Sequence, residues 1–263
     1  MTRPRLIVSD LDGTFLSPDG TISDVNRSAV EVAARQGIAF VAATGRPIRW
    51  LTLLAELRSA HPLVIASNGA VLWDLAAREV VEFSAVDAAC ARELCTRLRV
   101  GVPGIYFGVE TIHGFRCEPG TPTGHAESAE FVADVLDTDD PILKVLGFHG
   151  DLDSAELDAR VEGLAGDLVT VTHSTREGLG LVEISALGVS KASALIRLCE
   201  KLGVEPGEVA AFGDMPNDAA MLAWAGIPHV VANAHRSLVD AGFPVVGSNA
   251  DSGVGRQILA LLG

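Results

Sequence analysis

Short apolar runs alternate with longer amphipathic segments in the first and last thirds of this chain. Continuous apolar runs predict buried strands at residues 6–8, 38–43, 63–66, 209–212, 229–231 and 244–246. Apolar residues spaced three and four apart predict helices at residues 23–36, 48–58, 191–202 and 219–224. Buried strands that alternate with helices are typical of a parallel sheet covered on both faces, so an α/β fold is expected.

The middle of the chain, residues 84–185, has a different pattern. Hairpin-like strand pairs are predicted at 105–109 with 112–117 and at 168–174 with 179–184. Helices are predicted at 86–98, 127–136 and 154–164. This pattern indicates an antiparallel sheet with helices on one face, inserted into the parallel domain. We therefore expect one domain made of residues 1–83 and 186–263, interrupted by a second domain of residues 84–185.

The charge is strongly acidic, with 20 Lys and Arg against 34 Asp and Glu in 263 residues, a formal net charge of −14. Such a charge repels nucleic-acid phosphates and anionic membranes, so we expect neither as a partner. The inserted segment alone has 7 basic and 18 acidic residues. Two interpretations of that acidity stay open: a surface kept soluble by its charge, or a lid that closes over a site and selects the leaving group.

Composition also limits the cellular setting. The sequence has no apolar run of the ~18 residues that span a bilayer, and its first residues lead directly into a predicted strand, so no signal peptide is expected. The four cysteines have no metal-binding or disulfide-scaffold spacing. A cytoplasmic protein is therefore the expectation.

Four polar clusters each follow a predicted strand of the parallel sheet. They are Asp10-Leu11-Asp12-Gly13-Thr14, Thr44-Gly45-Arg46, Ser67-Asn68-Gly69 and Gly213-Asp214-Met215-Pro216-Asn217-Asp218. Ligands of open α/β sheets bind at the carboxyl ends of the strands, so Asp10, Asp12, Asp214 and Asp218 should lie close together. Gathered carboxylates raise one another's pKa unless a cation neutralises them. Oxygen ligands alone favour a hard ion, most often Mg²⁺.

These residue types suit the transfer of a phosphoryl group. A magnesium site cancels the charge of a phosphate ester, and a carboxylate nucleophile divides one difficult hydrolysis into two easier steps. A second carboxylate two residues later can protonate the leaving oxygen and then activate water. Lys191 and the hydroxyl of Thr44 can bind the phosphoryl oxygens. Each cluster alone could be an ordinary turn or helix cap, so the prediction depends on their occurring together.

With these residues in view, the chain resembles the haloacid-dehalogenase-like (HAD) phosphotransferases. Asp10 to Thr14 resembles the first motif of that family, Thr44 the second, Lys191 the third, and Gly213 to Asp218 the fourth. The insertion between the second and third motifs resembles the large cap of the type-IIB, Cof-like phosphatases. Two other segments resemble Cof-like signatures, Ser67-Asn68-Gly69-Ala70 and Val231-Ala232-Asn233-Ala234. The resemblance implies a Rossmann-like parallel-sheet core, the HAD fold, with an inserted α+β cap domain.

The resemblance also implies a role for each matched residue. Asp10 would be the nucleophile and Asp12 the general acid and base. Substrate binding would fall to Thr44, Gly45, Lys191 and Asn217. Mg²⁺ would be bound by Asp10, the backbone carbonyl of Asp12 and Asp214, with Asn217 and Asp218 in support.

The leading hypothesis is thus a Mg²⁺-dependent phosphatase that acts on a small phosphorylated metabolite, a sugar phosphate or a phosphorylated cofactor, through an aspartyl phosphate. Two alternatives remain: a sugar phosphomutase of similar layout, and a sensor that binds a phosphorylated ligand without turning it over. In the inserted segment His113, Arg116 and His125 are candidates for contacts that set specificity.

Overall fold

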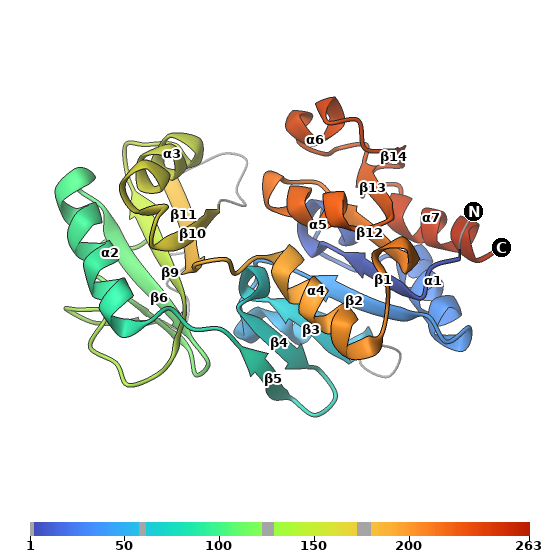
Figure 1. The fold of residues 1–263 in the computed structure, drawn as a ribbon, viewed down its shortest axis with the longest axis horizontal. Coiled ribbons are helices and arrows are strands. Elements are labelled where there is room, and N and C mark those ends of the chain that lie inside the picture. The colour runs from blue at the N-terminus through green and yellow to red at the C-terminus, as the bar shows by residue number, and fades with distance from the viewer. Residues whose placement is uncertain (1–2, 58–61, 123–128, 173–179) are drawn as a thin grey trace. The chain divides into compact units, whose positions relative to one another are not determined.

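The computed structural model describes residues 3–57, 62–122, 129–172 and 180–263. The chain forms two compact units, of which the first combines Met1–Glu82 with Lys191–Gly263 and the second is Phe83–Ser190 (Figure 1). We refer to them as unit 1 and unit 2. None of the helices in the described ranges has the length and apolar character needed to cross a membrane.

Unit 1 is built on an eight-stranded sheet with the order β14-β13-β12-β1-β2-β3-β4-β5. Its strands are β1 (Leu6–Ser9), β2 (Ala39–Ala43), β3 (Leu63–Ala66), β4 (Val71–Asp74), β5 (Glu79–Phe83), β12 (Val209–Gly213), β13 (Ile227–Val231) and β14 (Val245–Val246). All six strands predicted from the apolar runs are present, and neighbours from β14 to β3 pair in parallel. The predicted α/β fold is confirmed.

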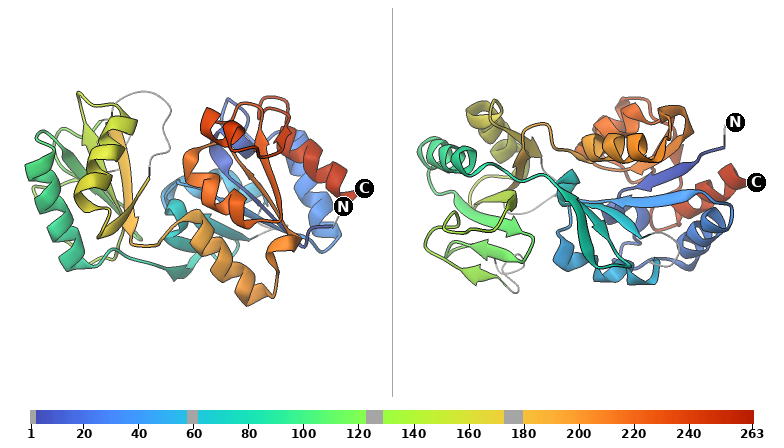
Figure 2. Two further views of the ribbon diagram at one scale, coloured as in Figure 1. Left: turned by 45° about the horizontal axis from the view of Figure 1, so that its top comes forward. Right: turned by 60° about the horizontal axis from the view of Figure 1, so that its bottom comes forward.

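Helices cover both faces of this sheet. The helices of unit 1 are α1 (Asp24–Arg35), α4 (Lys191–Leu202), α5 (Ala219–Trp224), α6 (Arg236–Asp240) and α7 (Gly253–Leu262). On one face α1 packs against α7, and on the other α4 packs against α5 (Figure 2). Short helical turns cover Leu11–Phe15, Ile48–Leu57, Ser67–Gly69, Pro206–Glu208 and Pro216–Asp218. The helix predicted at residues 48–58 is therefore present, in the tighter 3₁₀ form over its described part.

Sequence patterning correctly places the ends of α1 and α4, although it predicted no helix where α6 and α7 lie. The hydroxyl of Ser23 caps α1 by accepting a hydrogen bond from the amide of Asn26, and Gly37 follows the helix with a φ of 72°. Helix α4 begins at Lys191 and ends at Leu202, with Gly203 following at a φ of 61°. The start of α4 matters for function because it fixes the backbone position of Lys191.

Unit 1 also contains two strands that the apolar pattern does not predict. Strand β4 pairs with β3 in the antiparallel direction, so the sheet is parallel only from β14 to β3. Strand β5 forms the edge, and its side chains alternate between exposed and half-buried. A short edge strand with that alternation lacks the continuous apolar run of a central parallel strand.

Unit 2 is a six-stranded sheet with the order β10-β11-β9-β6-β7-β8. Its strands are β6 (Tyr106–Thr111), β7 (Phe115–Cys117), β8 (Glu130–Phe131), β9 (Ile142–His149), β10 (Val169–Thr172) and β11 (Gly180–Ala186). Both predicted strand pairs are antiparallel neighbours, β6 with β7 and β10 with β11. The pattern missed β9, which lies between β6 and β11 and is buried along its whole length.

Two helices of unit 2, α2 (Ala88–Gly101) and α3 (Ser154–Ala165), agree with the prediction. The helix predicted at residues 127–136 is wrong over its described part. Glu130 and Phe131 form β8 beside β7, and the chain then turns at Asp134, whose carboxylate accepts a hydrogen bond from the amide of Leu136 at 2.9 Å. A local side-chain turn of this kind competes with helix formation, which the apolar spacing alone does not reveal.

The core of unit 2 lies between its sheet and the two helices, where α2 and α3 contact one another. A buried ion pair joins Lys144 on β9 to Glu183 on β11, and the side chains are 3% and 6% exposed.

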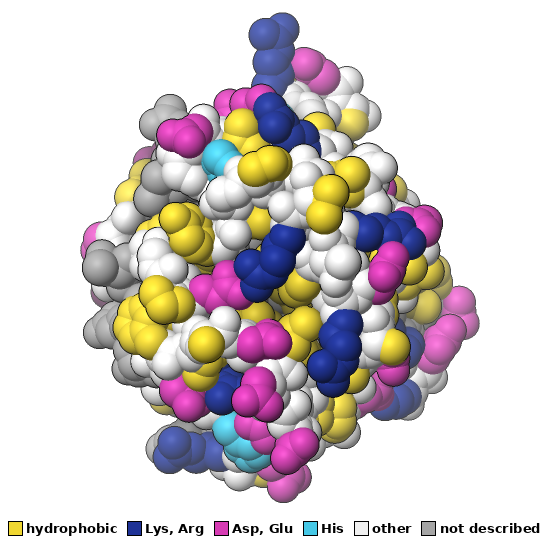
Figure 3. Space-filling view, turned by 90° about the vertical axis from the view of Figure 1, so that its left-hand side faces the viewer, with side chains coloured by type: hydrophobic (Ala, Val, Ile, Leu, Met, Phe, Trp, Pro, Cys, Tyr) yellow, Lys and Arg dark blue, Asp and Glu magenta, His cyan; other side chains and the backbone are white. Residues whose placement is uncertain are grey.

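On the face shown in Figure 3, Lys and Arg side chains are interspersed among Asp and Glu. Acidity on this face is therefore not a continuous field, which is typical of a charged, solvated surface.

Candidate active site

Three acidic side chains from two distant segments meet at the carboxyl end of the central strands in unit 1. Asp10 follows β1, and Asp214 and Asp218 follow β12, which is hydrogen-bonded to β1. One carboxylate oxygen from each lies within 4.8 Å of the others, and the three residues are 5%, 1% and 0% exposed. The expected convergence of carboxylates is therefore present for these three.

Lys191 supplies the positive charge of this cluster. Its Nζ donates hydrogen bonds to Oδ1 of Asp10 at 2.7 Å and to Oδ1 of Asp218 at 2.8 Å, and the residue is 2% exposed. One ammonium against three ionised carboxylates leaves two negative charges in a buried volume. A single divalent cation would balance that excess.

The surroundings shift the protonation of these groups in a consistent direction. Burial raises the pKa of Asp10 well above its ordinary value, and the nearby charges of Asp218 and Asp214 raise it further, against the opposing effect of Lys191. Burial alone would lower the pKa of Lys191, but the carboxylates of Asp10 and Asp218 outweigh burial and raise it. Lys191 is thus a fixed cation, while Asp10 needs additional positive charge to stay ionised.

Small residues and local hydrogen bonds allow this close approach. A Cβ atom on Gly13 would lie 2.5 Å from Oδ2 of Asp214, and Gly13 has a φ of 76°, so both space and backbone favour glycine there. The hydroxyl of Thr14 donates to Oδ1 of Asp214 at 2.7 Å. Oδ2 of Asp218 accepts from the amides of Asp214 and Met215 at 3.0 and 3.1 Å. These bonds fix the directions of both carboxylates.

The side chain of Asp12 lies outside the buried cluster, contrary to the expectation that all four carboxylates gather. Its carboxylate, 55% exposed, accepts two hydrogen bonds from Arg46, from Nε at 2.7 Å and from Nη2 at 2.6 Å. The backbone between Asp10 and Phe15 bends in a wide turn, since Gly13 adopts a positive φ. The turn leaves Asp12 beside the cluster, held by an arginine from the loop after β2.

Thr44 and Gly45 follow β2, next to β1 in the sheet. Thr44 is fully buried, and its Oγ1 accepts a hydrogen bond from the amide of Arg46 at 3.0 Å, so its hydroxyl hydrogen stays available for an acceptor. The amide of Asn68 donates to the carbonyl of Thr44 at 3.0 Å. This bond ties the second motif to the Ser67–Gly69 turn that follows β3.

That turn has an unusual backbone. Ser67, Asn68 and Gly69 have φ values of 49°, 54° and 98°, so three successive residues are left-handed. For a residue with a Cβ this conformation costs roughly 1–2 kcal/mol. Strained backbone of this type persists only where its surroundings hold it, and it is frequent near functional sites.

Asn217 lies in the 3₁₀ turn between β12 and α5, and its Nδ2 donates to Oδ1 of Asn68 at 3.3 Å. Sequence reasoning gave Asn68 and Asn233 no individual role. It named Asn68 in a polar cluster after a strand and in a signature segment, and Asn233 in a signature segment. In the structure Nδ2 of Asn233 donates to the carbonyl of Gly13 at 2.7 Å. Asn233 therefore supports the first motif, and Thr14, itself part of that motif, supports Asp214. The only signal in the sequence was that Thr14 lies in the motif and Asn233 in a signature segment.

The residues of unit 2 singled out for specificity have local partners. Arg116 pairs with Glu130 at 2.9 Å and also donates to the backbone carbonyl of Asp137. Nε2 of His113 lies 3.8 Å from Asp140. His125 lies outside the described residues. A role of these side chains in specificity stays a prediction.

The donor set of the buried cluster suits a divalent metal ion. It consists of carboxylate oxygens, and hard cations such as Mg²⁺ prefer such ligands. Three acids held within one small volume, with their net negative charge only partly balanced by Lys191, could hold such an ion.

Comparison with known proteins agrees with this arrangement. A family described as haloacid dehalogenase-like hydrolase matches residues 7–258. The 5-amino-6-(5-phospho-D-ribitylamino)uracil phosphatase YcsE of Bacillus subtilis is 29% identical over 97% of this chain and 94% of its own.

Solved structures show the same fold along the whole chain. A haloacid dehalogenase-like hydrolase from Bacteroides thetaiotaomicron superposes with a TM-score of 0.81 at 25% identity, over 98% of this chain and 100% of its own. The HAD subclass IIB sugar phosphatase BT4131 superposes with a TM-score of 0.81 at 19% identity, over 97% of this chain and 98% of its own. At that lower identity the likeness shows the fold alone.

Proposed function

We propose that this chain, which belongs to the haloacid dehalogenase-like hydrolases and is a phosphoric monoester hydrolase, hydrolyses a small phosphorylated metabolite at the Asp10 cluster with Mg²⁺. Within that family we place it in the Cof-like type-IIB group. The observation that carries this proposal is the contact of buried Lys191 with Asp10 and Asp218, next to Asp214. It unites three of the four motifs in one charged site.

In the first chemical step a carboxylate oxygen of Asp10 attacks phosphorus, and the bond from phosphorus to the ester oxygen breaks. The departing oxygen takes a proton from Asp12. In the second step Asp12, now a carboxylate, takes a proton from water as the water oxygen attacks phosphorus. The bond between phosphorus and Asp10 then breaks and inorganic phosphate leaves.

The other residues bind and orient the phosphoryl group in this proposal. Lys191 neutralises charge on the phosphoryl oxygens, and the hydroxyl of Thr44, the loop at Gly45 and the amide of Asn217 donate hydrogen bonds. Mg²⁺ would be held by the carboxylates of Asp10 and Asp214 and the carbonyl of Asp12, with Asp218 in support. It would supply the positive charge that keeps Asp10 ionised and aligns the ester.

The division of labour between the units is also part of the proposal. Unit 1 holds the cluster and would be the catalytic core, and unit 2, Phe83–Ser190, would be the cap. For the substrate, we propose a sugar phosphate or a phosphorylated cofactor. The Bacillus subtilis relative is a 5-amino-6-(5-phospho-D-ribitylamino)uracil phosphatase, so that uracil derivative is added to the compounds to be tested.

A phosphate-release assay tests the proposal. Purified protein is freed of metal with a chelator and incubated with p-nitrophenyl phosphate, with and without added Mg²⁺, and then with a panel of the metabolites named above. Mg²⁺-dependent release of phosphate supports the proposal. Isomerised ester from a hexose 1-phosphate with a bisphosphate activator would indicate a mutase, and binding without release would indicate a sensor.

A further inference from the structure

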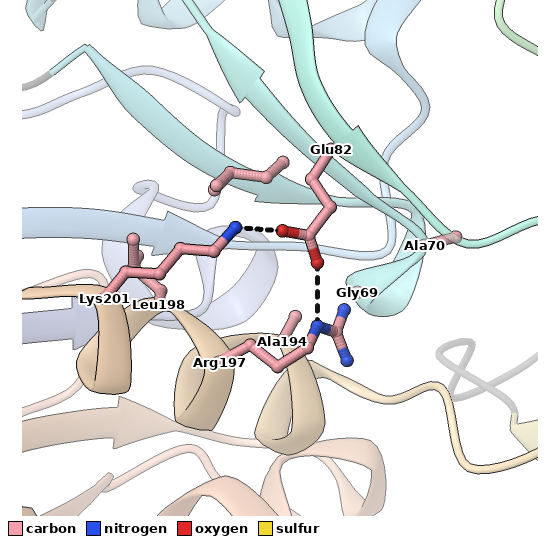
Figure 4. A pocket seen from close by; sticks show the side chains of 8 residues that line it. Gly69, Ala70, Glu82, Ala194, Arg197, Leu198 and Lys201 are labelled. Atoms are coloured by element: carbon pink, nitrogen blue, oxygen red, sulfur yellow. Dashed lines mark hydrogen bonds and ion pairs between the residues drawn. The ribbon is translucent and has the colours of Figure 1, made fainter.

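The strained Ser67–Gly69 turn takes no part in the mechanism proposed above, although it lies beside two residues that do. Its backbone is held from two sides. On one side the amides of Ser67 and Asn68 donate to the carbonyls of Arg46 and Thr44, both at 3.0 Å. On the other side the turn packs against α4, and Gly69 and Ala70 border a small hollow beside that contact (Figure 4). The surroundings therefore fix the position of the turn.

The fixed turn gives Asn68 one defined direction. Asn68 is 2% exposed, and its Oδ1 accepts the hydrogen bond from Nδ2 of Asn217 at 3.3 Å. At the opposite end of that amide, Oδ1 of Asn217 is buried and accepts no hydrogen bond from the described residues. No hydrogen bond from a described residue therefore holds Oδ1 of Asn217. The contact with Asn68 decides the directions in which the nitrogen and the oxygen of the Asn217 amide point.

The orientation of that amide matters because phosphoryl oxygens only accept hydrogen bonds. Asn217 can bind them through Nδ2 but not through Oδ1. The contact with Asn68 uses one of the two hydrogens on Nδ2 and leaves the second for a ligand. We propose that Asn68 is a positioning residue, which sets the amide of Asn217 so that its nitrogen serves the phosphoryl group. This inference rests on the proposed function, in which Asn217 contacts that group.

Two variants separate the hydrogen bond from the backbone strain. Asn68→Gly removes the acceptor and relaxes the left-handed backbone, whereas Asn68→Ala removes the acceptor and keeps the strain. A matched control is Arg78→Gly, which makes the same type of change at a left-handed position, φ 57°, in the turn between β4 and β5. Thermal denaturation of each variant reports the effect on stability separately.

We expect both Asn68 variants to raise KM for p-nitrophenyl phosphate and the inhibition constant of inorganic phosphate by about tenfold, the effect of one misplaced hydrogen bond. The value of kcat should change less, and Arg78→Gly should match the wild type. In an Asn217→Ala background, Asn68→Gly should change KM less than twofold, because the group through which it acts is gone.

Three results would overturn the inference. The first is that Asn68→Gly changes KM equally in the wild-type and Asn217→Ala backgrounds. The second is that KM follows thermal stability, so that Asn68→Ala has a much higher KM than Asn68→Gly, and the third is that Asn68→Gly has the same kinetics as Arg78→Gly. Failure of the proposed function gives a different result. In that case the wild type itself releases no phosphate with Mg²⁺, whatever residue stands at position 68.

Discussion

Arg46 donates two parallel hydrogen bonds to the carboxylate of Asp12, one from Nε at 2.7 Å and one from Nη2 at 2.6 Å. A bidentate pair fixes the plane of the carboxylate as well as its position. Arg46 is anchored in turn, because its amide donates to Thr44 and its carbonyl accepts from Ser67. The proposed acid and base is thus oriented by the loop that also holds the phosphoryl-binding threonine.

Replacing Arg46 with lysine should therefore impair proton transfer. Lysine keeps the charge but cannot form the two-pronged contact. We expect kcat for an alkyl phosphate to fall by about 10- to 100-fold, the range in which misplaced catalytic groups act. Turnover of p-nitrophenyl phosphate should fall less, since its leaving group needs little protonation. Steady-state kinetics with both esters check this.

The matched control for Arg46→Lys is Arg49→Lys. Arg49 lies in the 3₁₀ helix that follows this loop, and its guanidinium lies over the ring of Trp50, 4.3 Å from the centroid. The control should leave the ratio of the two rates unchanged. Equal losses on both esters in Arg46→Lys would contradict an effect on proton transfer.

The change Asp10→Asn preserves the shape of the side chain and removes its nucleophilic charge. Turnover should fall by at least about 10³-fold, as for the loss of other nucleophiles. The far-ultraviolet circular dichroism spectrum should stay that of the wild type. Asp19→Asn, at an exposed loop carboxylate that accepts bonds from Thr21, is the control and should retain full activity. Substantial hydrolysis by Asp10→Asn would remove Asp10 from its proposed role.

Lys191→Met should destabilise the metal-free protein by about 3–5 kcal/mol, the cost of leaving buried charges without a partner. Without the ammonium, the pKa of buried Asp10, already raised by burial, rises further. When a carboxyl group has a raised pKa in the folded state, the folded protein loses stability as pH rises through that pKa. The destabilisation of Lys191→Met relative to the wild type should therefore be larger at pH 8 than at pH 5.

Urea denaturation in the presence of a chelator at both pH values measures this effect. Lys201→Met is the control, because Lys201 lies on the same helix but pairs with Glu82 at the surface. A difference between Lys191→Met and wild type that does not change with pH would show that lost packing, rather than uncompensated carboxylates, causes it.

Divalent metal should stabilise the folded protein through the acidic cluster. Mg²⁺ at about 100 times its dissociation constant would add about 2.7 kcal/mol to the free energy of unfolding. Asp214→Asn should abolish most of that gain, because Asp214 is one of the three clustered acids. Asp139→Asn, at an exposed acid in unit 2, should retain the gain. A melting temperature that rises equally with Mg²⁺ in both variants would place the ion elsewhere.

The buried ion pair of unit 2 provides a prediction about stability alone. Lys144→Met leaves the carboxylate of Glu183 buried without its ammonium partner and should cost about 3–5 kcal/mol. The double change Lys144→Met with Glu183→Leu removes both charges and should recover most of that loss. Denaturant midpoints of the two variants measure the difference. A double variant less stable than Lys144→Met would show that the pair is itself strongly stabilising.

The parallel part of the fold was predictable because its strands carry continuous apolar runs that are buried on both faces. The missed elements lack that signal or depend on distant partners. Strand β9 has Lys144 in its middle, and its neighbours β6 and β11 are far from it in sequence. Around Asp134, a side-chain turn prevails over apolar spacing that fits a helix. Tertiary pairing decides β9, whereas a local side-chain hydrogen bond decides the turn at Asp134, and the spacing of apolar residues shows neither.

For the site, sequence reasoning anticipated that segments about two hundred residues apart would meet, because strand ends in a parallel sheet share one edge. Asp10, Asp214, Asp218 and Lys191 do so. It expected the Asp12 side chain to join the cluster, whereas a backbone turn and the ion pair with Arg46 direct that side chain away. The contact of Asn68 with Asn217 was also not predictable, because it depends on a left-handed turn that cannot be inferred from composition.

The pairing of β1 with β12 has a consequence for synthesis of the chain. Leu6 lies beside Val209 in the sheet, and the whole of unit 2 is made between them. At typical ribosome speeds of 5–20 residues per second, β1 waits roughly 10–40 s for β12, although β2, its neighbour on the other side, follows it closely in the chain. Unit 2 is one continuous segment, so it is able to fold on the emerging chain first. Until β12 emerges, one edge of this apolar strand stays unpaired, and an unpaired strand edge is prone to pair with other chains.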